Sequence, residues 1–344
     1  MRSTLPITLV RIAGPYNFGR PMGANQLLAV YVRCAKRQSV ERWGQDYQPA
    51  IRAVQSEAPA KSWASRVRYY KHRRDLHLFG QTENPAGYLA LHFPGTVDIQ
   101  EQKVLWPWAT PHPLDGSPYY KGPPLSPLPG MYETVKRLGQ VDKLARIHVP
   151  GDLTNSGKRE IAIVPFIGDL LLFLVDVAGP YCVNWTIKDN KSSFEQPAFG
   201  SLKHRRSADA AVLEALRHSG ERENYASAGI RTVQIVKSDL DDAVFANLRC
   251  LHYGLNVPVT ECAAKDDLEG RLVLGLEAGI PPQASFCAVM HRHRCTSEFC
   301  RAVAQRMIWE RRLLVDMYST ILFDLPLRPM SRDVLQHYAH WFRR

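Results

Sequence analysis

Three side chains suited to metal-dependent hydrolysis lie between Ile161 and Lys188. Asp169 offers a carboxylate, and Thr186 and Lys188 follow on the next apolar run. Side chains alternate along a strand, so Thr186 and Lys188 would share one face while Ile187 points to the other. A carboxylate can hold a divalent cation, and an ammonium on the same face can stabilise developing negative charge. The spacing fits phosphodiester hydrolysis, or a plain buried hairpin whose Asp and Lys lie at solvated strand ends.

Two apolar runs must position these groups. The first, IAIVPFIGDLLLFLVD, is too β-branched and apolar for a surface loop, and it breaks at the turn signal Gly179-Pro180. The second run is YCVNWTIKD, so the pair predicts a strand hairpin. Asp176 is a competing acid, but it lies close to the turn, where solvation is expected. Asp169 is therefore the preferred ligand.

The segments on either side each predict a helix and a strand. Upstream, Glu83 opens ENPAGYLALHFPGTVDIQEQ, which has helical and then strand character towards Gln102. Downstream, ADAAVLEALRHSGERENYASAGIRTVQIV predicts a helix, a turn at Gly229 and a strand. The order of elements is that of an α/β fold.

This order resembles the TnsA-type endonucleases of heteromeric transposons, within the PD-(D/E)xK nuclease superfamily. The resemblance covers roughly residues 75–255. It is carried by Glu83, Gln102, Asp169, the TIK of Thr186–Lys188 and ERENYASAGI at Glu221–Ile230. It implies a restriction-endonuclease-like mixed sheet flanked by helices.

The resemblance also implies the roles of individual residues. Glu83, Asp169 and Lys188 would be catalytic, with Glu83 and Asp169 as ligands of Mg²⁺ or Mn²⁺ and Lys188 beside the attacking water. Thr186 replaces the usual Gln or acid, and its backbone carbonyl can still bind a metal. Gln102 would position water or DNA.

Two further features bear on the site. An extra acid would come from Glu221 or Glu223, between which the sequence does not choose. The family's usual P-D-F around the aspartate is here Ile167-Gly168-Asp169-Leu170, which leaves open a site that has lost its chemistry.

By resemblance, the protein would cut the 5′ ends of a mobile element. A separate DDE-type transposase would cut the 3′ ends, under an AAA+ ATPase regulator, with double-stranded DNA at the transposon ends as substrate. Two alternatives remain open: a catalytically degenerate DNA-binding and assembly subunit of the transposition complex, and a stand-alone restriction-type nuclease.

Charge is consistent with a DNA partner. The 344 residues include 44 Lys and Arg against 33 Asp and Glu, a formal charge of +11. Basic clusters attract phosphate, although each can also be an ordinary solvated face. They are RVRYYKHRR with Arg73 and Arg74, KHRR at 203–206, HRHR at 291–294 and WERR at 309–312. Tyr69 and Tyr70 in the first cluster could stack on bases or pack inward.

Residues 256–344 predict a helical, winged-helix-like domain. Three helical patterns, the last with Thr296 as N-cap, precede MYSTILFDLPL, which alternates like a strand. A recognition helix needs a basic stripe, and Arg301 and Arg306 have suitable spacing for DNA contact, together with Gln305 and Arg312. Val303, Met307 and Trp309 could face the core.

The remaining segments are divided at their glycine- and proline-rich positions. Residues 1–60 form an extension of unclear role with one strand-like run, LLAVYVRCA, and residues 61–255 form the endonuclease-like domain. Within the latter, residues 103–155 form a proline-rich insertion that reads as a long ordered loop or a partner-binding arm. Without a membrane-length apolar run or a secretory leader, a cytoplasmic protein without membrane contact is expected.

Seven cysteines without framework spacing predict reduced thiols. Five potential zinc ligands lie within a short stretch: Cys287, His291, His293, Cys295 and Cys300. Their spacing lacks the usual paired cysteines, so buried thiols beside a basic turn are expected rather than a zinc site.

Overall fold

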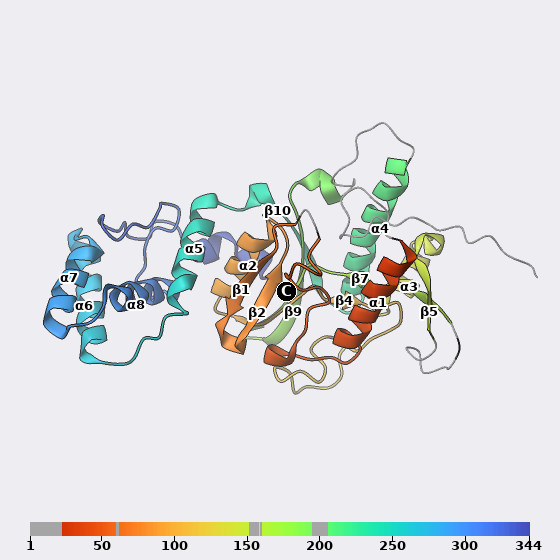
Figure 1. Cartoon of the computed structure of the whole chain (residues 1–344), viewed down its shortest axis with the longest axis horizontal. Coiled ribbons are helices and arrows are strands. Elements are labelled where there is room, and N and C mark those ends of the chain that lie inside the picture. The colour runs from red at the N-terminus through yellow and green to blue at the C-terminus, as the bar shows by residue number, and fades with distance from the viewer. Residues whose placement is uncertain (1–22, 60–61, 151–157, 159, 195–205) are drawn as a thin grey trace, which may run out of the picture.

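The computed structural model describes residues 23–59, 62–150, 158, 160–194 and 206–344, and only the helix backbone over 206–214. It is an α/β protein with a mixed sheet flanked by helices (Figure 1). Its helices are α1 Ala24–Gln38, α2 Glu83–His92, α3 Met131–Arg137, α4 Arg206–Ala226, α5 Asp242–Gly254, α6 Ala263–Ala278, α7 Pro282–His293, α8 Ser297–Trp309 and α9 Val334–His337.

The central sheet has four strands in the order β10-β9-β8-β3. β10 is parallel to β9, and the other two pairings are antiparallel. Three small pairs, β1-β2, β4-β7 and β5-β6, surround it. The strands are β1 Ser65–Tyr69, β2 Arg74–Leu78, β3 Thr96–Glu101, β4 Val104–Leu105, β5 Arg146–Val149, β6 Glu160–Ile163, β7 Phe166–Ile167, β8 Leu170–Asp176, β9 Gly179–Lys188 and β10 Arg231–Val236.

The first five residues of strand β8, Leu170 to Leu174, are apolar and buried because the sheet is covered on both faces. Leu170, Leu172 and Leu174 belong to the core shared with α2 and α5. Leu171 and Phe173 belong to a second core shared with α3 and α4. Helices thus cover both sides of the strand that follows Asp169.

The flanking predictions are confirmed. Helix α2 begins at Glu83 and leads into β3, and helix α4 leads through Gly229, at φ +74°, into β10. These elements place the sequence-predicted acids around one sheet.

The predicted hairpin is confirmed only in its second part. Strands β8 and β9 pair from Leu170 opposite Trp185 to Asp176 opposite Gly179. The earlier part of the first run forms β6 and β7, which pair with β5 and β4 instead. The break at Pro165 and Gly168 divides one apolar run among three sheets.

The strand-like run LLAVYVRCA was wrongly predicted, because it lies in helix α1. Its buried residues, Leu27, Val30, Tyr31 and Cys34, have the spacing of a helix face. This face packs near Val149 of β5 and Ile51. The N-terminal region therefore contributes to the cores beside the sheet.

The predicted insertion at 103–155 is not one loop, since it contains β4, α3 and β5, and its residues 151–155 lie outside the described residues. Its proline-rich part, residues 106–130, is a long irregular connection. Leu114 and Leu128 within it are buried against Phe173, and Trp106 stacks on Trp108 with ring centroids 4.7 Å apart. Its irregular backbone follows from its prolines, which lack the N–H donor.

The three C-terminal helices α6, α7 and α8 are confirmed, and Thr296 Oγ1 caps α8 by accepting from Phe299 N at 3.1 Å. The strand expected over Met317–Leu327 is wrong, since the described chain has only an isolated bridge, Val315 to Pro329, in this region. The segment instead packs as loops, with Phe323 against Phe286.

The end of the described chain returns to the central sheet. Phe342 stacks on Phe93 with centroids 3.9 Å apart, and Trp185 Nε1 donates to Trp341 O at 3.1 Å. One hydrophobic core therefore joins residues of the sheet with residues of the C-terminal helices. Among the described helices, none combines the length and the apolar character needed to cross a bilayer.

Candidate functional site

One edge of the central sheet collects the predicted polar residues. Gln102 follows the end of β3, Asp169 precedes β8, and Lys188 ends β9. Because β8 is antiparallel to β3 and β9, these positions meet at the same edge. Glu83 approaches this edge from the first turn of α2.

Glu83 is held from two sides. Its Oε2 accepts from Phe79 N at 2.8 Å, and its Oε1 accepts from Gln102 Nε2 at 2.9 Å. Gln102 has φ +53°, and its backbone N donates to Asp169 O at 2.9 Å. Gln102 is thus a positioning residue between the two candidate ligands.

Asp169 faces the end of β9. Its Oδ2 accepts from Ile187 N at 2.7 Å, and Thr186 Oγ1 lies 3.4 Å from the same oxygen. Arg217 Nη2 of α4 lies 3.5 Å from Oδ1. Thr186 Oγ1 also lies 3.2 Å from His218 Nδ1.

Helix α4 supplies the third acid. Glu221 is fully buried, and its Oε1 accepts from Asn184 Nδ2 at 2.9 Å. Its Oε2 is buried without a hydrogen-bond partner among the described residues. Glu223 lies on the exposed side of the same helix, so the choice that the sequence left open falls on Glu221.

Gly168 makes room for this acid. A Cβ at position 168 would lie 2.9 Å from Glu221 Oε1. The glycine therefore has a steric reason in this fold, since a side chain there would displace the buried carboxylate.

The acids influence one another. Burial, then the Asp169 charge, raises the pKa of Glu83 to about 8, while the Phe79 hydrogen bond and Lys188 oppose the rise. Burial, with a contribution from Asp169, raises the pKa of Glu221 to about 7, against the lowering effect of Arg217. The three carboxyl groups and Lys188 therefore form one electrostatic cluster, and a cation among them would relieve the repulsion.

In the part of the chain that the structure describes, no three His, Cys, Asp or Glu side chains converge as a ready-made metal site. Each candidate acid is turned towards a protein donor: Glu83 to Phe79 and Gln102, Asp169 to Ile187, and Glu221 to Asn184. Hard oxygen donors of this kind suit Mg²⁺ or Mn²⁺. Binding would require the carboxylates to turn from these donors towards the cation.

Asp176, the competing acid, is remote from the cluster at the other end of β8. Arg344 Nη2 lies 2.8 Å from its Oδ1, and this hydrogen-bonded pairing lowers the pKa of Asp176. The preference for Asp169 agrees with this placement.

Arg74 is a correction to the predicted DNA contacts. Its guanidinium is 9% exposed and pairs with Glu101 at 2.9 Å, between the rings of Tyr47 and Tyr69. It is therefore a core residue, whereas Arg73 is exposed. Of the two tyrosines of this cluster, Tyr69 packs inward and Tyr70 is 36% exposed.

The predicted basic stripe of α8 is also incomplete. Arg306 donates to the carbonyls of Gly254, Leu255 and Val257, and Gln305 is buried against Cys250. Arg306 thus ties α8 to the end of α5 instead of facing outward. Val303, Met307 and Trp309 face the core as expected.

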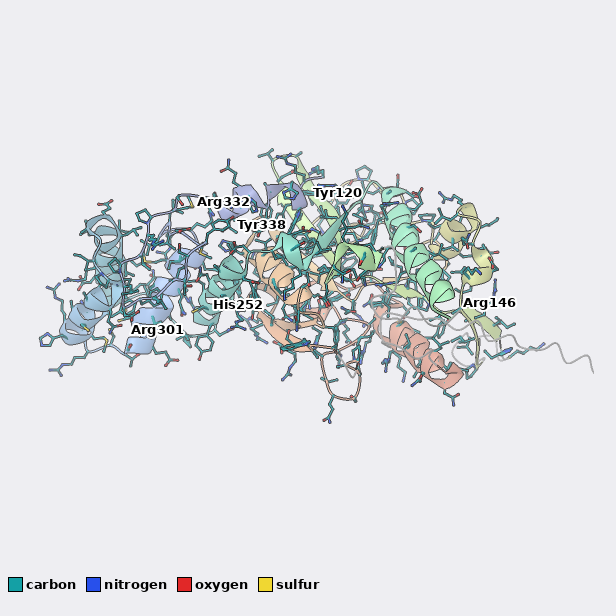
Figure 2. The ribbon with its side chains drawn as sticks, turned by 90° about the horizontal axis from the view of Figure 1, so that it is seen from above. Tyr120, Arg146, His252, Arg301, Arg332 and Tyr338 are labelled. Carbon is teal, nitrogen blue, oxygen red and sulfur yellow. The ribbon has the colours of Figure 1, made fainter. Side chains whose placement is uncertain are left out.

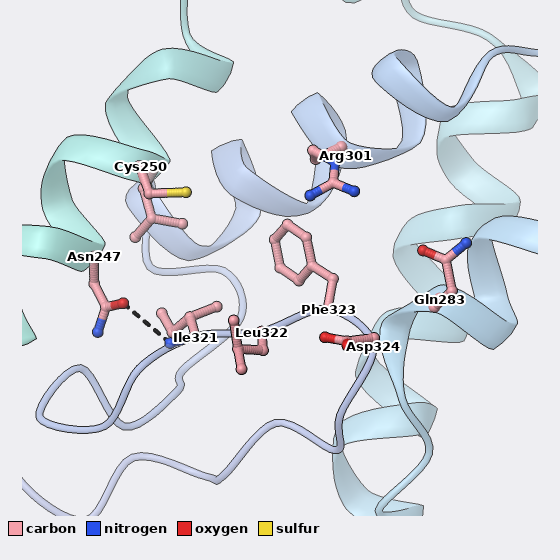
Figure 3. Close-up of a pocket in the computed structure, with 9 residues that line it drawn as sticks. Asn247, Cys250, Gln283, Arg301, Ile321, Leu322, Phe323 and Asp324 are labelled. Atoms are coloured by element: carbon pink, nitrogen blue, oxygen red, sulfur yellow. Dashed lines mark hydrogen bonds between the residues drawn. The ribbon is translucent and has the colours of Figure 1, made fainter.

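Of the two predicted contacts Arg301 and Arg306, Arg301 alone is exposed. It lines a cavity of about 410 Å³ beside Phe323 and Asp324 (Figure 3). Its guanidinium lies 5.8 Å from the Phe323 ring centroid. Figure 2 shows Arg301 in the helical end of the molecule and Arg146 at the opposite end. Of the four predicted DNA contacts, only Arg73 and Arg301 are exposed, because Arg74 and Arg306 bind partners within the fold.

The cysteine-histidine stretch is dispersed over α7, α8 and the loop between them. His293 Nε2 lies 3.0 Å from Asp267, and Cys295 Sγ lies 3.6 Å from Cys300 Sγ. Cys287 is exposed. Of the KHRR cluster, residues 203–205 lie outside the described residues.

Sequence reasoning missed Arg217, His218 and Asn184. Arg217, His218 and Glu221 are spaced as one face of a helix, and all three are buried. Polar residues on the face of α4 that packs against a sheet were the available signal. Asn184 shares the strand face of Thr186, so strand alternation could have found it.

No protein-family model matches this chain, and no curated protein sequence is significantly similar to it.

Proposed function

We propose that the protein is a divalent-metal DNA endonuclease with a PD-(D/E)xK-like core. In this proposal it acts as the TnsA-like subunit of a heteromeric transposase and cuts the 5′ ends of a mobile element. The observation that carries the proposal is the mutual influence of Glu83, Asp169, Glu221 and Lys188 at one sheet edge. The transposase and its AAA+ regulator enter only through the sequence resemblance.

The donor set fits a hard cation. Glu83, Asp169 and Glu221 would hold it, and the unpartnered Oε2 of Glu221 is a buried oxygen available for such a ligand. When bound, a divalent ion supplies charge stabilisation for phosphodiester hydrolysis. The raised pKa values of Glu83 and Glu221 mean that binding must displace protons.

Lys188 has a separate role. It projects from the same face of β9 as Thr186, opposite to the buried Ile187. Its charge lowers the pKa of both buried glutamates, so it lies within electrostatic reach of the whole cluster. It would orient the attacking water and stabilise negative charge at phosphorus.

A second function is favoured by one observation. Arg217 lies 3.5 Å from Asp169, and a guanidinium beside the central carboxylate could take the place of a metal ion. A catalytically degenerate DNA-binding and assembly subunit would use the same fold with this internal cation. A stand-alone restriction-type nuclease differs from both in that it would cut DNA without partners. The winged-helix-like assignment of residues 256–344 stays a prediction.

The test is Mg²⁺- or Mn²⁺-dependent nicking of transposon-end DNA by the full chain, alone and with its transposase and ATPase partners. Asp169→Asn and Lys188→Ala should each lower the nicking rate about 100-fold or more. Asp176→Asn and Lys191→Ala are matched controls on exposed positions outside the cluster.

Loss of 5′ cutting in the first pair but not in the controls would support the nuclease. Cutting that is unchanged in all four variants, or absent from the wild-type assembly, would favour the assembly subunit. Cutting by the chain without partners would point to the stand-alone enzyme.

A further inference from the structure

A polar groove of about 660 Å³ runs beside β10, the edge strand of the central sheet. One wall is β10 itself, with Arg222 of α4 beside it, and the other is the segment His337–Trp341. Tyr338, which is labelled in Figure 2, is one of the lining residues. None of these groove residues was among the predicted DNA contacts.

The groove carries positive charge. Arg222, Arg231 and His340 are exposed in it. Arg231 Nη1 donates to His340 O at 2.7 Å, which fixes its guanidinium in the groove. Arg222 has no ion-pair partner within the described residues. The one acid of the groove, Asp239, has its Oδ2 turned back to accept from Val236 N at 3.0 Å.

The groove adjoins the acid cluster through the sheet. Thr232 pairs with Asn184 and Gln234 with Thr186, so their side chains share the face that carries the site. Asn184 Nδ2 lies 3.3 Å from Thr232 Oγ1 and 2.9 Å from Glu221 Oε1. The Asn184 side chain thus connects Thr232, which lines the groove, to Glu221, a candidate metal ligand.

We propose that this groove binds the sugar–phosphate backbone of the DNA strand that leads into the acid cluster. That the bound polyanion is DNA rests on the proposed function. That the groove binds a polyanion rests on its arginines. Arginine guanidinium groups suit phosphate oxygens, and contacts of this kind position a strand without reading its sequence. A peptide without acidic side chains, added to the β10 edge, would leave these arginines without anionic partners.

The test is the affinity of the full-length chain for a fluorescein-labelled DNA duplex, measured by anisotropy with Ca²⁺ in place of Mg²⁺. The groove variant is Arg222→Glu with Gln234→Glu, two exposed positions whose side chains make no described hydrogen bond. The control is Arg137→Glu with Gln55→Glu, which are exposed and change the net charge equally.

The groove variant should bind DNA about 10-fold more weakly. The slope of its log affinity against log salt concentration should decrease by the equivalent of about one phosphate contact or more. The control should stay within about threefold of wild type. Equal weakening of both variants, unchanged binding in the groove variant, or absence of DNA binding by the wild type would each overturn the groove proposal.

Failure of the nuclease proposal has a different signature. Mn²⁺ affinity, followed by titration calorimetry, should be the same in the groove variant and in wild type, because Arg222 and Gln234 are not candidate ligands. A chain that binds DNA through the groove but neither binds Mn²⁺ nor cuts DNA would support the groove proposal and contradict the nuclease proposal.

Discussion

The backbone N–H of Ile187 donates a 2.7 Å hydrogen bond to Asp169 Oδ2. The candidate ligand that precedes β8 is thereby fixed to the strand that carries Thr186 and Lys188. The pairing of the two strands, with Leu170 opposite Trp185, brings these positions together. The spacing of acid and lysine in the sequence is thus a consequence of strand register.

The stability of the protein should fall as the pH rises from about 4.5, the ordinary pKa of a glutamate, to about 7 to 8, the pKa values of Glu221 and Glu83 in the folded protein. A folded-state pKa above the unfolded value contributes stability that is complete below the unfolded pKa and lost above the folded one. Mg²⁺ should reduce this loss. Urea unfolding at pH 6 and pH 9 checks it, and Glu221→Gln should flatten the dependence while the exposed Glu223→Gln does not.

Acid should destabilise the protein through its buried histidines. Burial lowers the pKa of His92 and His252 to about 4, and both rings pack against Trp309. A depressed folded pKa contributes stability above the unfolded value near 6.5, and this contribution is lost as the pH falls towards 4. Thermal unfolding between pH 7 and pH 4 should show a smaller decrease for His92→Phe. An equal decrease in wild type and variant would exclude His92 as the cause.

Gly168→Ala should impair cation binding more than folding. The added Cβ would lie 2.9 Å from Glu221 Oε1, so the buried carboxylate must move. We expect Mn²⁺ affinity to fall about 10-fold, in the range typical for displaced supporting groups. Titration calorimetry measures it. Gly139→Ala is a control for glycine replacement, since nothing lies within 4 Å of its added Cβ; its positive φ of +68° costs stability without touching the site.

Arg74→Ala should destabilise the fold by about 3–5 kcal/mol, because it leaves the buried Glu101 carboxylate without its partner. The neighbouring exposed Arg73→Ala should stay within about 0.5 kcal/mol of wild type. Denaturant unfolding compares the two. Similar stabilities for both variants would contradict a core role for Arg74.

Local patterns sufficed for elements whose periodicity has one interpretation. Helix α4 and strand β10 follow from a long amphipathic run ended by Gly229. The run in α1 does not determine its own structure, because short apolar segments with β-branched residues fit either helix or strand. The alternation in Met317–Leu327 failed because the segment packs as loops instead of pairing with a strand.

The residues of the site also fall into those that local sequence patterns predict and those that only the packing of the fold determines. Asp169 and Lys188 could be predicted because strand parity and turns are local properties. Arg217 and Asn184 could not, because their burial depends on how α4 packs against β9. The loss of Arg74 and Arg306 as surface contacts has the same cause, since each finds its carboxylate or carbonyl partners only in the folded chain.

The contact between Trp341 and the sheet has a consequence for folding kinetics. Trp185 and Trp341 are 156 positions apart, and Tyr181 donates to Phe342 O across 161 positions. Contacts between such distant positions impose a large loop-closure entropy and form slowly. We expect the strands β8 and β9 to form first and the aromatic tail to dock late, so refolding should show a slow phase in tryptophan fluorescence that Trp341→Ala removes.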